Sequence, residues 1–167
     1  MLTAEKIIKM FNMKPLTGEG GYYTETYRSD VKIPPSVLPD CYKTGRNIST
    51  TILYLLTPKS CSKLHRIKTD EIFHFYLGDP VRILQLFSDG GVREITLGSD
   101  IERGQQVQTI IPKNTWQGSY LLKNGRFALL GTTVSPGFEF QDFQRPRNPQ
   151  ELIQKFPQQK DLIIKLT

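Results

Sequence analysis

The feature that most limits what this chain can fold into is a series of short runs rich in β-branched and aromatic residues, each followed by Gly, Pro, Asn or Asp. β-Branched and aromatic side chains favour extended strands, whereas the residues between the runs favour turns. The runs read GYYTETYR, ISTTILYLL, EIFHFYLG, VRILQLF, VREITLG, QVQTIIP, WQGSYLL and RFALLGTTV. Short strands at this spacing predict an all-β sandwich or barrel.

Two of the turns between these runs have the composition of tight β-hairpins. Asp89, Gly90 and Gly91 separate VRILQLF from VREITLG, and Asn124 and Gly125 separate WQGSYLL from RFALLGTTV. Asp-Gly and Asn-Gly readily take the positive backbone angles that two-residue hairpin turns need. The sequence therefore predicts that each of these two pairs of runs forms antiparallel neighbours.

A short helix is expected on each side of the β region. Thr3 can cap a helix that runs to about Asn12. Towards the other end, Asn148 can cap a helix with Pro149 at its first position, and this helix should occupy about residues 149–156.

Length, composition and charge narrow the class of protein. A chain of 167 residues suffices for one domain with a single hydrophobic core, and we expect residues 1–167 to form it. No apolar run approaches the roughly 20 residues that cross a bilayer, so no membrane partner is expected. The first residues do not resemble a secretory signal, which predicts a cytoplasmic protein. The net charge of +6 comes from basic residues spread along the chain, which argues against binding of nucleic acid.

Candidate reactive residues are concentrated in LHRIKTDEIFHFYLG, residues 64–78, which contains both histidines of the chain. His65 ends one predicted strand and Glu71 begins the next, so an antiparallel return through residues 66–70 can bring the imidazole close to the carboxylate. Such a pair could bind a ligand. It could also be a structural pair in which each group satisfies the hydrogen bonds of the other.

His74 lies on the second of these strands, and its role depends on the face that it occupies. Alternation places Glu71, Phe73 and Phe75 on one face, and Asp70, Ile72, His74 and Tyr76 on the other. Histidine titrates near neutral pH, so His74 could transfer protons with Asp70 orienting it. The alternation favours instead a histidine packed in a dimer contact, unless a bulge after Glu71 reverses the faces.

The run EGGYYTETYRS adds two candidates. Alternation places Glu25 and Tyr27 on one face of the strand and Arg28 on the other. Tyr27 could donate a phenolic hydrogen bond, and Arg28 could bind a phosphate or carboxylate of a ligand. Pairing of Arg28 with Glu25 or Asp30 at the surface is the simpler alternative.

The only tryptophan of the chain, Trp116, precedes Gln117 in the run WQGSYLL. Its flat indole could form a wall for a sugar or a base ring, and packing in the core is an equally good explanation. The residues that we expect to bind a substrate are Arg28, Trp116 and Gln117.

The spacing within the histidine-containing stretch resembles a known family signature. His65 is followed by Ile67 after one residue, by Glu71 after three more, and by Gly78 after six more. This resembles the first signature of the cupin superfamily, H-x-H-x(3,4)-E-x(6)-G, with Ile67 in the place of the second histidine.

A later stretch, GQQVQTIIPKNTWQG, is similar to the second cupin signature, G-x(5)-P-x-G-x(2)-H. Counted from Pro112, Asn114 occupies the usual glycine position and Gln117 occupies the position of the histidine ligand. The interval from Gly104 to Pro112 is two residues longer than the signature.

Further segments narrow the resemblance to a small subfamily of epimerase-like (RmlC-like) cupins whose activity is largely unassigned. These segments are EGGYYTETYRS, TTILYLLTP, HRIKTDEIFHFYLGDP, IPKNTWQG and VSPGFEFQDF, which together cover about residues 18–143. The resemblance implies an all-β double-stranded β-helix, the jelly-roll or cupin barrel, with short flanking N- and C-terminal helices. It also implies a homodimer, and a strand such as 21–28 would suit exchange between the two chains.

The resemblance also implies a divalent metal, which cupins typically hold with three histidines and a glutamate. The corresponding residues of this chain are His65, Glu71 and Gln117, and their chemistry suits Mn, Fe, Ni or Zn. A glutamine oxygen adds little affinity, so we expect such a metal to be weakly held. A pocket that is empty or occupied by an organic ligand is the alternative.

The leading functional hypothesis is an isomerase or epimerase that acts on a sugar or sugar nucleotide in the barrel pocket. In this hypothesis His65 or His74 removes a proton beside a carbonyl, and Tyr27 or Glu71 returns one. Arg28 would hold an anionic group of the substrate.

Two other functions are compatible with the same residues. A barrel with a degraded metal signature keeps its cavity and could be a non-catalytic module that binds a small polar or anionic metabolite. A metal-dependent oxygenase is the third hypothesis, and the missing ligand histidines weaken it.

Overall fold

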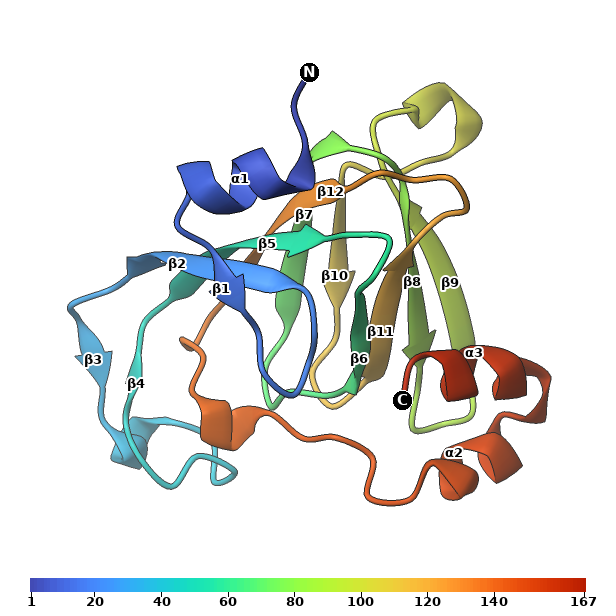
Figure 1. The fold of residues 1–167 in the computed structure, drawn as a ribbon. Coiled ribbons are helices and arrows are strands. Elements are labelled where there is room, and N and C mark those ends of the chain that lie inside the picture. The colour runs from blue at the N-terminus through green and yellow to red at the C-terminus, as the bar shows by residue number, and fades with distance from the viewer.

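The computed structural model describes residues 1–167 and consists mainly of antiparallel strands in two facing sheets (Figure 1). The larger sheet has the strand order β1 (Lys14–Pro15), β2 (Tyr22–Arg28), β5 (Thr50–Leu56), β12 (Ala128–Val134), β7 (Glu71–Gly78) and β10 (Gln108–Ile111). The smaller sheet has the order β6 (Cys61–His65), β11 (Trp116–Leu121), β8 (Val81–Leu86) and β9 (Val92–Leu97). The predicted all-β architecture is confirmed.

Short elements surround the two sheets. The third, two-stranded sheet pairs β3 (Lys32–Ile33) with β4 (Arg46–Asn47). The helices are α1 (Ala4–Met10), α2 (Pro149–Lys155) and α3 (Lys160–Lys165). The 3₁₀ turns are η1 (Pro35–Val37), η2 (Ile101–Arg103), η3 (Phe140–Asp142) and η4 (Pro157–Gln159). None of the helices combines the length and the apolar character needed to cross a membrane.

The two predicted hairpins have different outcomes. β8 and β9 are antiparallel neighbours, with Leu86 opposite Val92, as predicted. The prediction for the turn at Asn124 was wrong, because β11 pairs with β6 and β8, whereas β12 pairs with β5 and β7 in the other sheet. Asn124 does take the left-handed conformation, with φ of 68°. The sequence therefore predicted the turn conformation at Asn124 correctly. The turn, however, connects two strands of different sheets and not two neighbours in one sheet.

Both predicted helices are confirmed together with their caps. The Thr3 hydroxyl accepts a hydrogen bond from the backbone N–H of Lys6, and the Asn148 side chain accepts one from the N–H of Gln150. Each helix ends slightly earlier than predicted. The helix α3 was not predicted, because Pro157 was taken to end the helical region and the chain instead resumes a helix one turn later.

Buried apolar side chains lie both inside and outside the barrel. Those between the two sheets are Tyr54, Leu56, Phe73, Val81, Ile83, Leu97, Ile111, Ala128 and Leu130. On the outer face of the larger sheet, α1 packs Ile7 against Leu55 and Leu129 (Figure 1). Beside the smaller sheet, α2 and α3 form a second outer cluster around Leu64 and Ile163. The helices thus close the outside of the barrel, while the interior cluster fills only part of its inside.

Candidate functional site

The part of the barrel interior that apolar side chains do not fill is a cavity of about 430 Å³. Residues of β2, β5, β7 and β12 line it, together with His65 of β6 and parts of the segments before β2 and after β12. The residues from these two segments are Asn12, Lys14, Leu16, Thr17, Glu19, Phe138, Glu139, Phe140 and Phe143. Pockets that hold small metabolites have volumes of about 300–1,000 Å³. We call this region the pocket end of the interior, and the region around Leu56 and Leu130 the apolar end.

His65 is the best-defined reactive group of the pocket end. It is 2% exposed, and its Nδ1 lies 2.8 Å from the backbone carbonyl oxygen of Lys63. A carbonyl oxygen can only accept, so Nδ1 carries the proton, and in the neutral ring Nε2 keeps a free lone pair. The ring of Phe143 stacks on the imidazole at a centroid distance of 5.1 Å. His65 is therefore held in one orientation and one tautomer.

The nearest charged group to that nitrogen is Glu19, which sequence reasoning missed. Its Oε2 lies 3.9 Å from Nε2 of His65, and its Oε1 accepts a hydrogen bond of 2.7 Å from the Ser62 hydroxyl. Glu19 lies in the loop before β2, where a Cβ on Gly20 would clash with the carbonyl oxygen of Cys61. The signal for this site was the EGG sequence, because Gly20 (φ 106°) lets the loop approach β6 closely.

Glu71 and Gln117 complete the group around His65, as the sequence predicted from their spacing. Gln117 lies opposite His65 in the β11–β6 register, and its amide nitrogen donates a hydrogen bond of 2.6 Å to the Glu71 carboxylate. Burial is the main reason why the pKa of the Glu71 carboxyl is raised. The three side chains therefore converge, and Glu71 holds its proton to a higher pH than an exposed glutamate.

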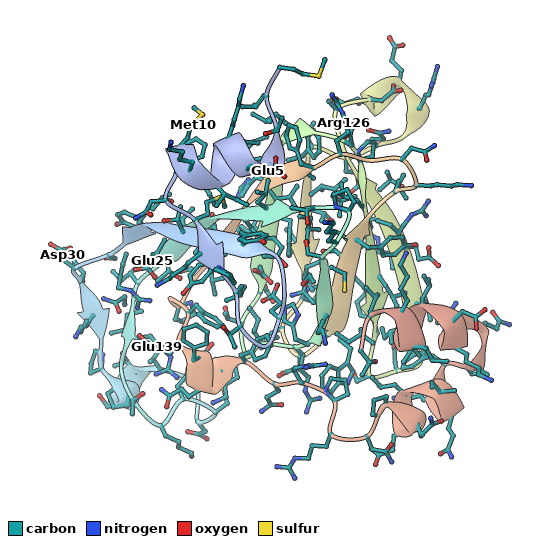
Figure 2. All side chains as sticks on the ribbon, viewed as in Figure 1. Glu5, Met10, Glu25, Asp30, Arg126 and Glu139 are labelled. Carbon is teal, nitrogen blue, oxygen red and sulfur yellow. The ribbon has the colours of Figure 1, made fainter.

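Arg28 lies at the pocket end, but two carboxylates already neutralise it. Its guanidinium contacts Glu25 at 2.8 Å and Glu139 at 3.0 Å, and it also donates to Asn47. Figure 2 shows Glu25 and Glu139 on the same side of the molecule. The hydrogen bond to Glu25 is the main reason why the pKa of Arg28 is raised. The simpler alternative, pairing with Glu25, is thus the observed arrangement.

Gln117 is not among the residues that line the cavity, and three other predicted site residues, Tyr27, His74 and Trp116, do not line it either. A shift in the β2–β5 register after Glu25 leaves Tyr27 54% exposed, so alternation assigned its face wrongly. The Nε2 of His74 lies 3.2 Å from the Thr133 hydroxyl, on the outer face of the larger sheet. The ring of Trp116 instead contacts the guanidinium of Arg66, which lies 4.6 Å from the ring centroid. The structure therefore brings none of these three to His65.

Comparison with known proteins places this geometry in a family. Residues 5–145 match the family described as Cupin superfamily (DUF985). The chain belongs to this family. It is also 33% identical, over 143 residues, to the uncharacterized protein YML079W of Saccharomyces cerevisiae, a match that covers 80% of this chain and 71% of the yeast protein.

Solved structures agree with the assignment to the cupins. A hypothetical protein from Leishmania major superposes with a TM-score of 0.88 at 30% identity and covers 99% of both chains. Protein SO0799 from Shewanella oneidensis has a TM-score of 0.85 at 31% identity, covering 100% of this chain and 98% of the other. A variant of Bacillus subtilis oxalate decarboxylase has a TM-score of 0.55 at 16% identity, covering 94% of this cupin and 38% of that chain, and shows the shared fold alone.

Membership of the cupins implies a divalent metal, but the donors of this cupin do not fit one. Ile67 lines the cavity at the position of the usual second histidine, and Gln117 presents an N–H to Glu71 instead of an oxygen to a cation. No group of three or more His, Cys, Asp or Glu is arranged to hold a metal ion. Metal binding by His65, Glu71 and Gln117 stays a prediction. Elemental analysis after loading with Mn, Fe, Ni or Zn is expected to find well below one equivalent per chain.

Proposed function

We propose that this cupin binds a small polar metabolite, such as a sugar, in the barrel cavity and moves a proton beside its carbonyl group, as an isomerase or epimerase does. The observation that carries the proposal is the orientation of His65. Its Nδ1 donates to the carbonyl of Lys63, so Nε2 is left free for a ligand in the cavity that His65 lines. An imidazole held in this way is suited to act as a general base.

Glu71 supports the same proposal as the group that returns the proton. Its carboxyl is buried beside His65, and burial raises its pKa. A carboxyl with a raised pKa can donate a proton at a pH where an exposed glutamate has already lost its own. His65 as base and Glu71 as acid would then act on one substrate carbon and a neighbouring oxygen.

The test is solvent exchange followed by NMR. Glucose, mannose and glucosamine are incubated with the protein in deuterated water, and loss of the proton on the carbon next to the carbonyl is measured. We expect exchange with the native chain and a loss of about 100-fold or more in His65→Gln, the range typical of a general base. His74→Gln is the matched control, because His74 lies outside the cavity. Exchange that is as fast in His65→Gln as in His74→Gln would contradict the proposal.

A second candidate function is binding without catalysis, and a specific observation favours it. The other two proton-transfer candidates, His74 and Tyr27, do not line the cavity, so the reactive groups of the pocket are confined to the surroundings of His65. A sugar that binds in the cavity, loses affinity in His65→Gln and shows no deuterium exchange would favour this function.

The homodimer also belongs to this proposal. β1 pairs only with Tyr22 and Tyr23, so the rest of β2 presents an edge to which a second chain could add a strand. The exposed side chain of Tyr27, on the same strand, could bury apolar surface in the same contact. Light scattering during size-exclusion chromatography should then give about twice the mass of 19.1 kDa per chain.

A further inference from the structure

The cavity contains two hydrogen-bond acceptors that face each other without a donor between them. They are Nε2 of His65 and Oε2 of Glu19, which are 3.9 Å apart. This separation is too long for a hydrogen bond, and neither atom has a hydrogen-bond partner in the protein. The His65 side chain is 3% exposed and the Glu19 side chain 14% exposed, so bulk water has little access to either. A single donor atom placed about 2.8 Å from each acceptor would bridge them.

The charge of the cavity points in the same direction. The whole chain has a net charge of +6, but the charged lining is mainly acidic. The acidic side chains of the lining are Glu19, Glu25, Glu139 and the buried Glu71, whose raised pKa favours its neutral form, and its cationic side chains are Lys14 and Arg28. The guanidinium of Arg28 is already paired with two of these carboxylates, and the ammonium of Lys14 lies 5.3 Å from the ring centroid of Tyr23. No lysine or arginine forms an ion pair with Glu19.

We infer that the cavity selects a ligand that carries a protonated amine, such as an amino sugar, and that this ammonium group binds between Glu19 and His65. The inference rests on the ligand-binding part of the proposed function, since it names the class of ligand for the same pocket. It favours binding without catalysis, because an ammonium on Nε2 of His65 occupies the lone pair that a general base needs. An ammonium has three N–H donors and can therefore satisfy both acceptors at once. A sugar hydroxyl has one donor and satisfies only one of them.

Aromatic side chains on the wall of the cavity favour the same class of ligand. Phe143 stacks on His65, and the rings of Phe138 and Phe140 meet edge to face at a centroid distance of 5.4 Å. Aromatic rings attract cations through their negative faces, in addition to the attraction of the carboxylates. An anionic ligand would instead meet an uncompensated Glu19 and a cationic Arg28 whose donors are already engaged.

The test compares glucosamine, glucose and glucuronate, which have the same sugar ring but are cationic, neutral and anionic, respectively. Their affinities are measured by isothermal titration calorimetry at pH 7 and low salt. We expect glucosamine to bind about tenfold more tightly than glucose, and glucuronate to bind most weakly. Glu19→Gln should bring the three affinities close together. Glu102→Gln is the matched control, because it removes the same charge from the exposed turn η2 and should leave the order unchanged.

The outcomes separate this inference from the proposed function. Glucose and glucuronate could bind with affinities that fall in His65→Gln, while glucosamine binds no more tightly than they do. The cavity would then be a binding site, as the proposed function requires, and the charge inference would be overturned. A glucosamine preference that survives in Glu19→Gln also overturns it. If none of the three ligands binds, both the proposed function and the inference fail for sugars. The preference is supported only when it is present in the native chain and lost with Glu19.

Discussion

The apolar end and the pocket end of the barrel interior are built on the same strands but have opposite contents. On β12, Leu130 belongs to the apolar cluster, whereas Thr132, two residues later, borders the cavity. On β7, Phe73 belongs to the cluster and Glu71, two residues earlier, borders the cavity. The period of two decides which residues point inwards. The type of each inward residue then decides whether its part of the interior is packed or stays open for a ligand.

The pocket end also differs in how it is enclosed, because loops and not strands complete it. Asp142, in η3, forms two hydrogen bonds of 2.8 and 2.7 Å with Arg46 of β4, which is 1% exposed. This buried ion pair ties the segment that carries Phe143 to the loop before β5. Lys68 adds a third charge at 3.3 Å from the carboxylate. The wall of the pocket therefore depends on a few polar contacts, whereas the apolar end depends on many small packing contacts.

The largest loss of stability is expected from breaking the ion pair between Arg46 and Asp142. Asp142→Asn leaves the Arg46 charge buried without its carboxylate, which typically costs about 3–5 kcal/mol of unfolding free energy. Urea unfolding measures this loss, and ligand affinity should fall with it. The control is Glu94→Gln, which breaks the half-exposed pair with Arg82 and should cost less than about 1 kcal/mol. Similar losses in both variants would mean that the pocket wall does not depend on Arg46.

The next prediction compares the two ends directly on β5. Leu56→Ala creates a cavity in the apolar cluster and should cost about 2–5 kcal/mol. Ile52→Ala removes the same number of carbon atoms from a half-buried side chain that already borders the cavity, so it should cost roughly half as much. Paired urea titrations give the difference. If the two costs are equal, the pocket end is packed as tightly as the apolar end.

Glu71→Gln is expected to stabilise the protein, because it replaces a buried carboxyl of the pocket end by a neutral amide. The apolar end contains no such carboxyl. Burial raises the pKa of Glu71, so the folded chain keeps this proton where the unfolded chain has released it. The folded state then loses stability as the pH rises through that interval. Unfolding free energies at pH 4 to 8 should show the variant gaining on the native chain as the pH rises. A variant that is less stable at every pH would show that the Glu71 contacts outweigh its burial.

The smallest effect concerns His74, which serves as a reference outside the barrel. Burial lowers the pKa of His74 from its usual 6.5, so the unfolded chain takes up this proton first as the pH falls. Stability should therefore decrease as the pH falls through this region, and His74→Gln should reduce the decrease. The measurement is the same pH series of urea titrations. Loss of sugar binding in this variant would place His74 in the site and contradict its assignment to the outer face.

Several features were predictable because neighbouring residues determine them. The caps at Thr3 and Asn148 depend on hydrogen bonds to residues two or three positions away, and the β8–β9 hairpin depends on its own turn. Alternation along β7 correctly separated Glu71 from His74. The same local reasoning failed at Tyr27, because a bulge in β2 depends on the pairing with β5.

By itself, the sequence predicted the all-β class through strand periodicity, and its resemblance to the cupin signatures predicted the family and the proximity of His65, Glu71 and Gln117. Only the tertiary structure decided that Glu19 faces His65 and that Arg28 is neutralised by Glu139, a residue far along the chain. The physical reason is that a cavity is the space left between strands and loops. Its shape and charge depend on contacts between distant segments, which no local hydrogen bond or repeating pattern specifies.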